Sequence, residues 1–121
     1  MKVLVITEEK AIGYSLKEIL SMEDYEASIA ENWMDGLKLF GQESFEVAIV
    51  SLDSPHLTGM DFLAAIKQRN IALKVILMSR KPDDRVKESC MKMGAYGFLS
   101  IPIDLHELLI LLNSARIEKK G

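Results

Sequence analysis

Short apolar runs alternate along this chain with longer segments of helical periodicity, and this alternation limits the fold more than any other feature. The clearest runs are residues 3–6, 47–50 and 75–78, which are rich in β-branched side chains and bounded by polar residues. Continuous apolar runs of this length are typical of strands buried on both faces of a parallel sheet. Weaker runs at residues 27–30 and 97–100 bring the predicted number of strands to five.

Each predicted strand is followed by a segment whose apolar residues share one face of a helix. These stripes comprise Ile12, Leu16, Ile19 and Leu20; Leu37 and Phe40; Phe62, Leu63 and Ile66; Val86, Cys90 and Met93; and Leu105, Leu108, Leu109 and Leu112. Five strand–helix units in strict alternation predict an α/β fold, a doubly wound parallel sheet with helices on both faces.

The helix boundaries carry recognisable signals. Asn32, Thr58 and Asp104 have side chains that suit the N-caps of the second, third and fifth helices. Pro82 with the two following acids suits a first turn, and Gly94 suits a left-handed helix stop.

Composition and charge exclude several classes of protein. The 121 residues suffice for one domain, residues 1–121, in which 118–121 is either a charged tail or the start of a linker. The single cysteine, Cys90, excludes a disulfide framework and a multi-cysteine zinc cluster, and we expect no metal site and no cofactor. A net charge of −3 predicts no nucleic-acid binding by this domain. With no run long enough to span a membrane and no signal peptide, we expect a cytoplasmic domain.

Four segments resemble the receiver domains of two-component response regulators: KVLVITEEK, VAIVSLDSPHLTGMDFL, KVILMSRK and MKMGAYGFLSIPIDLHELL. The likeness extends from Met1 to about Lys119. It implies a CheY-like, flavodoxin-like sheet with strand order 2-1-3-4-5, two helices on one face and three on the other. It also implies a cis peptide bond between Ile101 and Pro102.

The same resemblance locates a phosphoacceptor pocket and shows that it is degenerate. In a working receiver the third strand ends in the acceptor aspartate, with proline four residues later and glycine four residues after that. Pro55 and Gly59 have this spacing, so Ser51 stands at the acceptor position. The first strand of working members ends in two acids that hold Mg²⁺, whereas Thr7 and Glu8 stand here.

Of the remaining pocket positions, two keep the residue type of a working receiver and one does not. Ser79 keeps the hydroxyl that ends the fourth strand, and Phe98 fills the aromatic switch position. Ile101 replaces the lysine that precedes the proline. Phosphoryl transfer needs a carboxylate nucleophile, a divalent cation and a positive charge. We therefore expect a pseudo-receiver: not an enzyme, not phosphorylated, and active through protein–protein contact.

Two alternatives use the same crevice. In the first, Asp53 is the phosphoacceptor and Glu8 a Mg²⁺ ligand, although Asp53 stands only two residues before Pro55. In the second, the domain binds a flavin, which the two acids after the first strand disfavour. Arg80 is expected to fold its guanidinium over the pocket toward Glu8 or Asp53.

The fourth and fifth helices and the fifth strand are predicted to form the partner surface. Exposed Met91, Tyr96, Ile110 and Leu111 would make a contiguous apolar patch there. Such a patch would bind a protein partner, a second copy or a C-terminal output domain.

Overall fold

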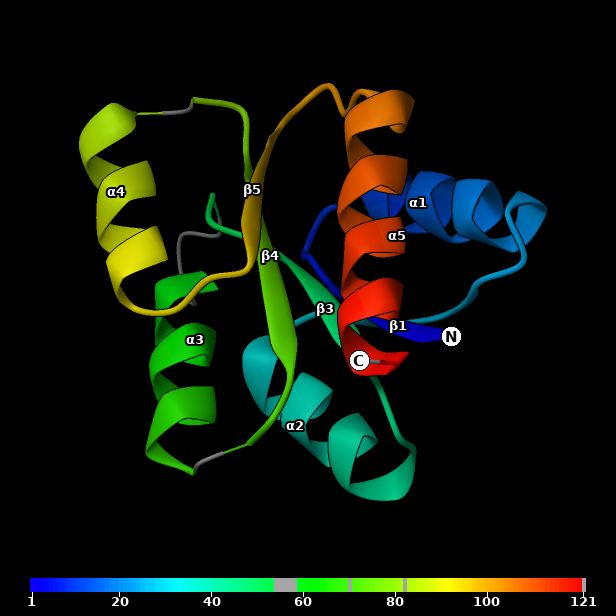
Figure 1. Ribbon diagram of the computed structural model, residues 1–121, viewed down its shortest axis with the longest axis horizontal. Helices are drawn as coiled ribbons and strands as arrows, with labels where there is room; N and C mark the ends of the chain where they lie inside the picture. The colour runs from blue at the N-terminus through cyan, green and yellow to red at the C-terminus, as the bar shows by residue number, and fades with distance from the viewer. Residues whose placement is uncertain (54–58, 70, 82, 121) are drawn as a thin grey trace.

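A five-stranded parallel sheet lies between two layers of helices (Figure 1). The computed structural model describes residues 1–53, 59–69, 71–81 and 83–120. Along the chain the elements are β1 (Lys2–Ile6), α1 (Lys10–Met22), β2 (Glu26–Ala30), α2 (Trp33–Gln42), β3 (Val47–Ser51), α3 (Gly59–Gln68), β4 (Lys74–Ser79), α4 (Asp84–Lys92), β5 (Gly97–Ser100) and α5 (Leu105–Lys120).

The strand order is β2-β1-β3-β4-β5, and every neighbouring pair is parallel. This confirms the predicted doubly wound, flavodoxin-like fold. The three central strands are buried along nearly their whole length, as their continuous apolar sequences predict. The bond between Ile101 and Pro102 is cis, as expected from the resemblance.

Two apolar cores cover the two faces of the sheet, because successive residues of a strand point to opposite sides. Val3 and Val5 belong to the core under α1 and α5, whereas Leu4 and Ile6 belong to the core under α2, α3 and α4. Figure 1 shows the same division, with α1 and α5 on one side of the sheet and α2, α3 and α4 on the other. The predicted distribution of helices is confirmed.

Most of the described helix boundaries follow the predicted signals. The side chains of Asn32 and Asp104 accept hydrogen bonds from Asp35 N and Glu107 N, respectively, and Gly94 has a φ of 101°. Asp83 is the N-cap of α4 rather than part of its first turn, since its carboxylate accepts from Arg85 N. The predictions for Thr58 and Pro82 lie outside the described residues.

Two predictions about helix faces need correction. Leu105 is 44% exposed and Val86 37% exposed, although both were assigned to buried stripes. Each lies in the first turn of its helix, just beyond the cap, where the sheet gives less cover. The backbone of α5 also continues through residue 120, so most of the predicted tail is helical. In the part of the chain described here, no helix is long and apolar enough to cross a membrane.

Candidate functional site

Three buried hydroxyl side chains lie at the carboxyl ends of adjacent strands. Thr7 follows the last residue of β1, whose Ile6 pairs with Val50, so Thr7 and Ser51 end neighbouring strands at the same level. Ser79 ends β4 on the other side of β3. Thr7, Ser51 and Ser79 are only 3%, 7% and 4% exposed. Neutral hydroxyls therefore lie at the strand ends where the resemblance predicts the crevice.

The Asp53 side chain forms hydrogen bonds with residues at the end of β4. Its backbone N donates to Ser51 Oγ at 3.3 Å, which turns the chain back over the end of β3. Its carboxylate accepts a hydrogen bond from Ser79 Oγ at 2.8 Å and another from Arg80 N at 2.7 Å. The side chain thus bridges the ends of β3 and β4.

The Ser79 hydroxyl is held by a defined set of partners. Its oxygen accepts a hydrogen bond from Lys81 N at 3.1 Å, so its proton is directed to Asp53. The backbone carbonyl of Ser79 accepts from Ile101 N at 2.8 Å, which joins the end of β4 to the segment after β5. This network orders the carboxyl end of β4.

The Arg80 guanidinium pairs with Glu9, not with Glu8 or Asp53 as the sequence predicted. Glu8 is exposed, whereas the backbone N of Glu9 donates to Thr7 Oγ1 at 3.1 Å. This turn brings the second acid of the loop toward Arg80. The hydrogen bond to Glu9 is the largest cause that raises the pKa of Arg80, and the charge of Asp53 acts in the same direction.

The side chains of this crevice do not fit a Mg²⁺ ion. Mg²⁺ prefers near-octahedral oxygen coordination that includes one or two carboxylates. Glu9 is engaged with Arg80, Asp53 is engaged with Ser79 and Arg80, and the strand ends carry hydroxyls. Within the described ranges, no group of three or more His, Cys, Asp or Glu side chains could hold a metal ion.

Ile101 stands where the resemblance predicts a lysine, and it packs as an apolar residue. It is partly buried against the core under α1 and α5. With Pro102 and Ile103 it lines a cavity of about 310 Å³, whose other wall is α1, including Ile12 and Ile19. An aliphatic side chain in this position offers no positive charge to an anion.

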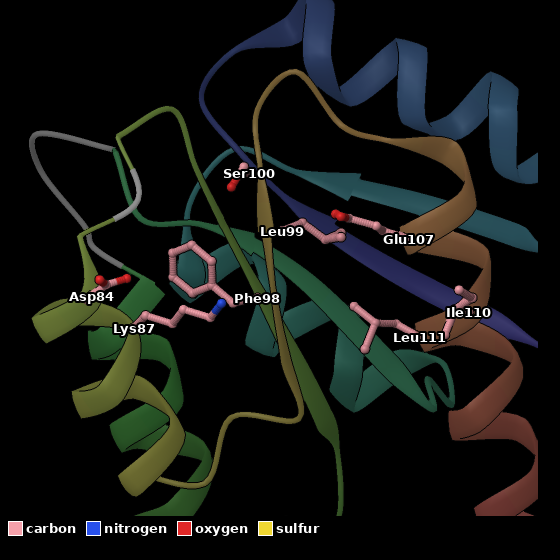
Figure 2. A pocket seen from close by; sticks show the side chains of 8 residues that line it. All are labelled: Asp84, Lys87, Phe98, Leu99, Ser100, Glu107, Ile110 and Leu111. Atoms are coloured by element: carbon pink, nitrogen blue, oxygen red, sulfur yellow. The ribbon is translucent and has the colours of Figure 1, made fainter.

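The face formed by α4, β5 and α5 contains a groove of about 510 Å³. Figure 2 shows Asp84 and Lys87 projecting from α4 on one side, and Ile110 and Leu111 from α5 on the other. Phe98 of β5 lies between them, with its ring on the α4 side of the strand. The predicted switch aromatic therefore forms part of the wall of this groove.

The predicted apolar patch on this face is smaller than expected. Met91 and Ile110 are 45% and 52% exposed, but Tyr96 and Leu111 are partly buried against the core. Leu111 packs over Gly97, where an added Cβ would lie 2.8 Å from a Leu111 methyl group. The absence of a side chain at position 97 lets Leu111 sink toward the sheet.

Two features of the site were missed in the sequence analysis. The role of Glu9 depends on the turn that follows Thr7, and two adjacent acids give no signal that separates them. The bridge from Asp53 to Ser79 and Arg80 joins residues 26 and 27 positions apart. The available signal was the pair of short side chains, Ser51 and Asp53, with spacing suited to a side-chain-to-backbone turn.

Comparison with known proteins agrees with this architecture. Residues 3–113 match the response regulator receiver domain family. A receiver domain protein from Clostridium thermocellum is similar in structure, with a TM-score of 0.90, 32% identity, and 98% of this chain and 96% of that chain covered. The structure of the beryllofluoride-activated NtrC4 receiver domain dimer gives a TM-score of 0.89 and 27% identity, with 97% of each chain covered.

The curated relatives are longer than this chain. The virulence-factor transcription regulator BvgA of Bordetella pertussis is 24% identical over 121 residues, which cover 99% of this chain and 56% of that protein. The chain thus spans about half the length of the curated relatives it matches. The strand order and the match over residues 3–113 both agree with this family. The chain belongs to the response regulator receiver domain family.

Proposed function

We propose that this chain is a pseudo-receiver, which takes part in two-component signalling through protein–protein contact without accepting a phosphoryl group at Ser51. The observation that carries the proposal is the chemistry of the strand ends. Thr7 and Ser51 offer buried hydroxyls, and Ile101 offers an aliphatic side chain, where carboxylates and a cation would be needed. At the three described positions Thr7, Ser51 and Ile101, neutral side chains thus stand in place of the groups that this reaction needs.

Serine cannot replace the aspartate in this reaction. A serine hydroxyl is nearly un-ionised at neutral pH and needs an activating base, and its phosphate ester is stable rather than labile. The Ser51 hydroxyl accepts a hydrogen bond from Asp53 N, and its 7% exposure gives a phosphodonor little access. Because several members of one catalytic unit are replaced together, residual activity is expected to be very low.

We assign the signalling contact to the face of α4, β5 and α5. This face has the groove of Figure 2, and Met91 and Ile110 add exposed apolar surface around it. A protein partner, a second copy or an output domain of the same regulator would cover it. Two similarities support these choices: a receiver dimer is among the similar structures, and BvgA is a transcription regulator.

The test is phosphorylation with a small-molecule donor. We expect the intact mass to be unchanged after incubation with acetyl phosphate and Mg²⁺. Addition of beryllofluoride with Mg²⁺ should leave the amide spectrum unchanged around Ser51 and Asp53. The matched control is the Ser51→Asp/Ile101→Lys variant, in which two pocket positions again carry the residues of a working receiver. A stoichiometric gain of one phosphate by the wild-type chain would refute the proposal.

A second candidate function is favoured by the position of Asp53. Its carboxylate is exposed and lies within hydrogen-bond distance of Ser79. In this alternative, Asp53 accepts the phosphoryl group and Glu8 is a Mg²⁺ ligand. An acyl phosphate on Asp53 would be released by hydroxylamine, and the Asp53→Ala variant would not form it. The same mass measurement therefore separates the two functions.

A further inference from the structure

The end of β4 presents two hydrogen-bond donors to one anionic group. The Ser79 hydroxyl and the Arg80 backbone N–H contact the two oxygens of the Asp53 carboxylate, at 2.8 and 2.7 Å. The hydrogen bond donated by Arg80 N is as short as charge-assisted hydrogen bonds usually are. Two donors that reach separate oxygens of a single anion form a small oxyanion-binding site.

Other protein groups hold these two donors in position. Ser79 is only 4% exposed, and the hydrogen bond from Lys81 N leaves its hydroxyl proton for Asp53. The hydrogen bond from Ile101 N to the Ser79 carbonyl fixes the backbone from the other side. The site therefore has the preorganised geometry that favours anion binding.

Positive charge adds to these donors. The Arg80 guanidinium extends from the same residue to Glu9, across the rim of the crevice. Its pKa is raised mainly by the hydrogen bond to Glu9, and the charge of Asp53 also raises it. The Arg80 guanidinium, which is paired with Glu9, thus places a positive charge at the same rim as the Asp53 carboxylate.

We propose that Asp53 is the resident ligand of this oxyanion site, and that its carboxylate takes the place of an external oxyanion such as inorganic phosphate. The proposal rests on the proposed function, since it assumes a crevice that is not phosphorylated. Asp53 then holds Ser79 and Arg80, at the end of β4, in their anion-bound arrangement. The next helix along the chain, α4, carries Asp84 and Lys87 of the groove in Figure 2.

Amide NMR with an inorganic phosphate titration tests the proposal. In the wild-type chain we expect the Arg80 amide proton to lie downfield and not to respond to phosphate. In Asp53→Ala it should move upfield, then return as phosphate binds. The affinity for phosphate should be at least about tenfold higher than in the wild type, equivalent to 1.4 kcal/mol of competition. Asp53→Asn, which keeps one acceptor oxygen without the charge, should give an intermediate shift.

Glu8→Ala is the matched control, because it removes an exposed acid from the same rim. It should leave both the Arg80 amide and phosphate binding as in the wild type. The proposal is overturned if Asp53→Ala leaves the Arg80 amide unmoved, or if both alanine variants bind phosphate equally well. Phosphorylation of the wild-type chain, with the Arg80 response to Asp53→Ala intact, would instead overturn only the proposed function.

Discussion

Introducing the two missing carboxylates should make the fold depend on a divalent cation. In the Thr7→Asp/Ser51→Asp variant, the new side chains would end adjacent strands at the same level. Parallel strands lie about 5 Å apart. At that separation two like charges repel by about 3 kcal/mol with an effective dielectric constant of about 20. We expect the free energy of unfolding to fall by about this amount.

Thermal denaturation with and without MgCl₂, at constant ionic strength, measures the effect. For a chain of this length 1 kcal/mol corresponds to a few degrees, so Tm should fall by about 10 °C without Mg²⁺. A Mg²⁺ concentration tenfold above its Kd should restore about 1.4 kcal/mol. The wild-type chain, whose strand ends carry hydroxyls, should show no such dependence on Mg²⁺.

The Thr7→Asn/Ser51→Asn variant is the control, because it matches the aspartates in size without their charge. Any loss of stability that it shares with the aspartate variant comes from packing. The reasoning would be refuted if both variants had the same Tm and neither responded to Mg²⁺. A wild-type Tm that rises with Mg²⁺ would also refute it, because it would reveal a resident cation site.

Three further predictions concern packing, titration and the partner face. Gly36→Ala should lower the free energy of unfolding in urea by about 1–3 kcal/mol, because its Cβ would lie 2.5 Å from a buried isoleucine methyl group. Gly41→Ala, with nothing within 4 Å, should raise it by about 0.5–1 kcal/mol. Burial raises the pKa of the Cys90 thiol, so the unfolded chain loses that proton first and stability should fall above about pH 8.5. Ile110→Glu should change stability by less than about 0.5 kcal/mol but weaken partner or self-association roughly tenfold or more, whereas Tyr14→Glu on α1 should not weaken it.

Each of these has an outcome that would contradict it. Equal effects of the two glycine substitutions would mean that α2 does not pack closely on β1. An alkaline loss of stability that persists in Cys90→Ala would assign the titration to another group. Association can be measured by sedimentation. If it depends on Tyr14 and not on Ile110, the interface lies on the face of α1 instead.

The interior of this fold could be predicted from sequence because each signal depends on local chemistry. A strand buried on both faces needs a continuous apolar run, and residues 47–50 satisfy this without reference to the rest of the chain. Asn32 caps α2 through the backbone N three residues later, so its role is also local. The position of Ser51 followed from the spacing of Pro55 and Gly59 and from the family likeness.

The rim of the crevice could not be predicted in the same way. Arg80 could reach several acids, and its choice of Glu9 depends on the turn set by the Thr7 hydroxyl. Helical periodicity placed Leu111 at the edge of the buried face, but its burial depends on the missing side chain of Gly97 on a different element. Side chains at the surface have many conformers of similar energy, so contacts with residues far away in the sequence decide which conformer is adopted.

The separation between core and rim explains how this fold tolerates substitution at its pocket positions. The two cores are formed by the strand interiors and the helix stripes, whereas the pocket positions lie at or just beyond the strand ends. Replacing adjacent carboxylates with hydroxyls removes a repulsion that only a cation offsets, so it favours the fold in the absence of metal. The hydrogen-bond donors of Ser79 and Arg80 then both bind a single carboxylate, that of Asp53. We therefore expect the geometry at the end of β4 to persist without Mg²⁺ or phosphate, and to be lost when Asp53 is removed.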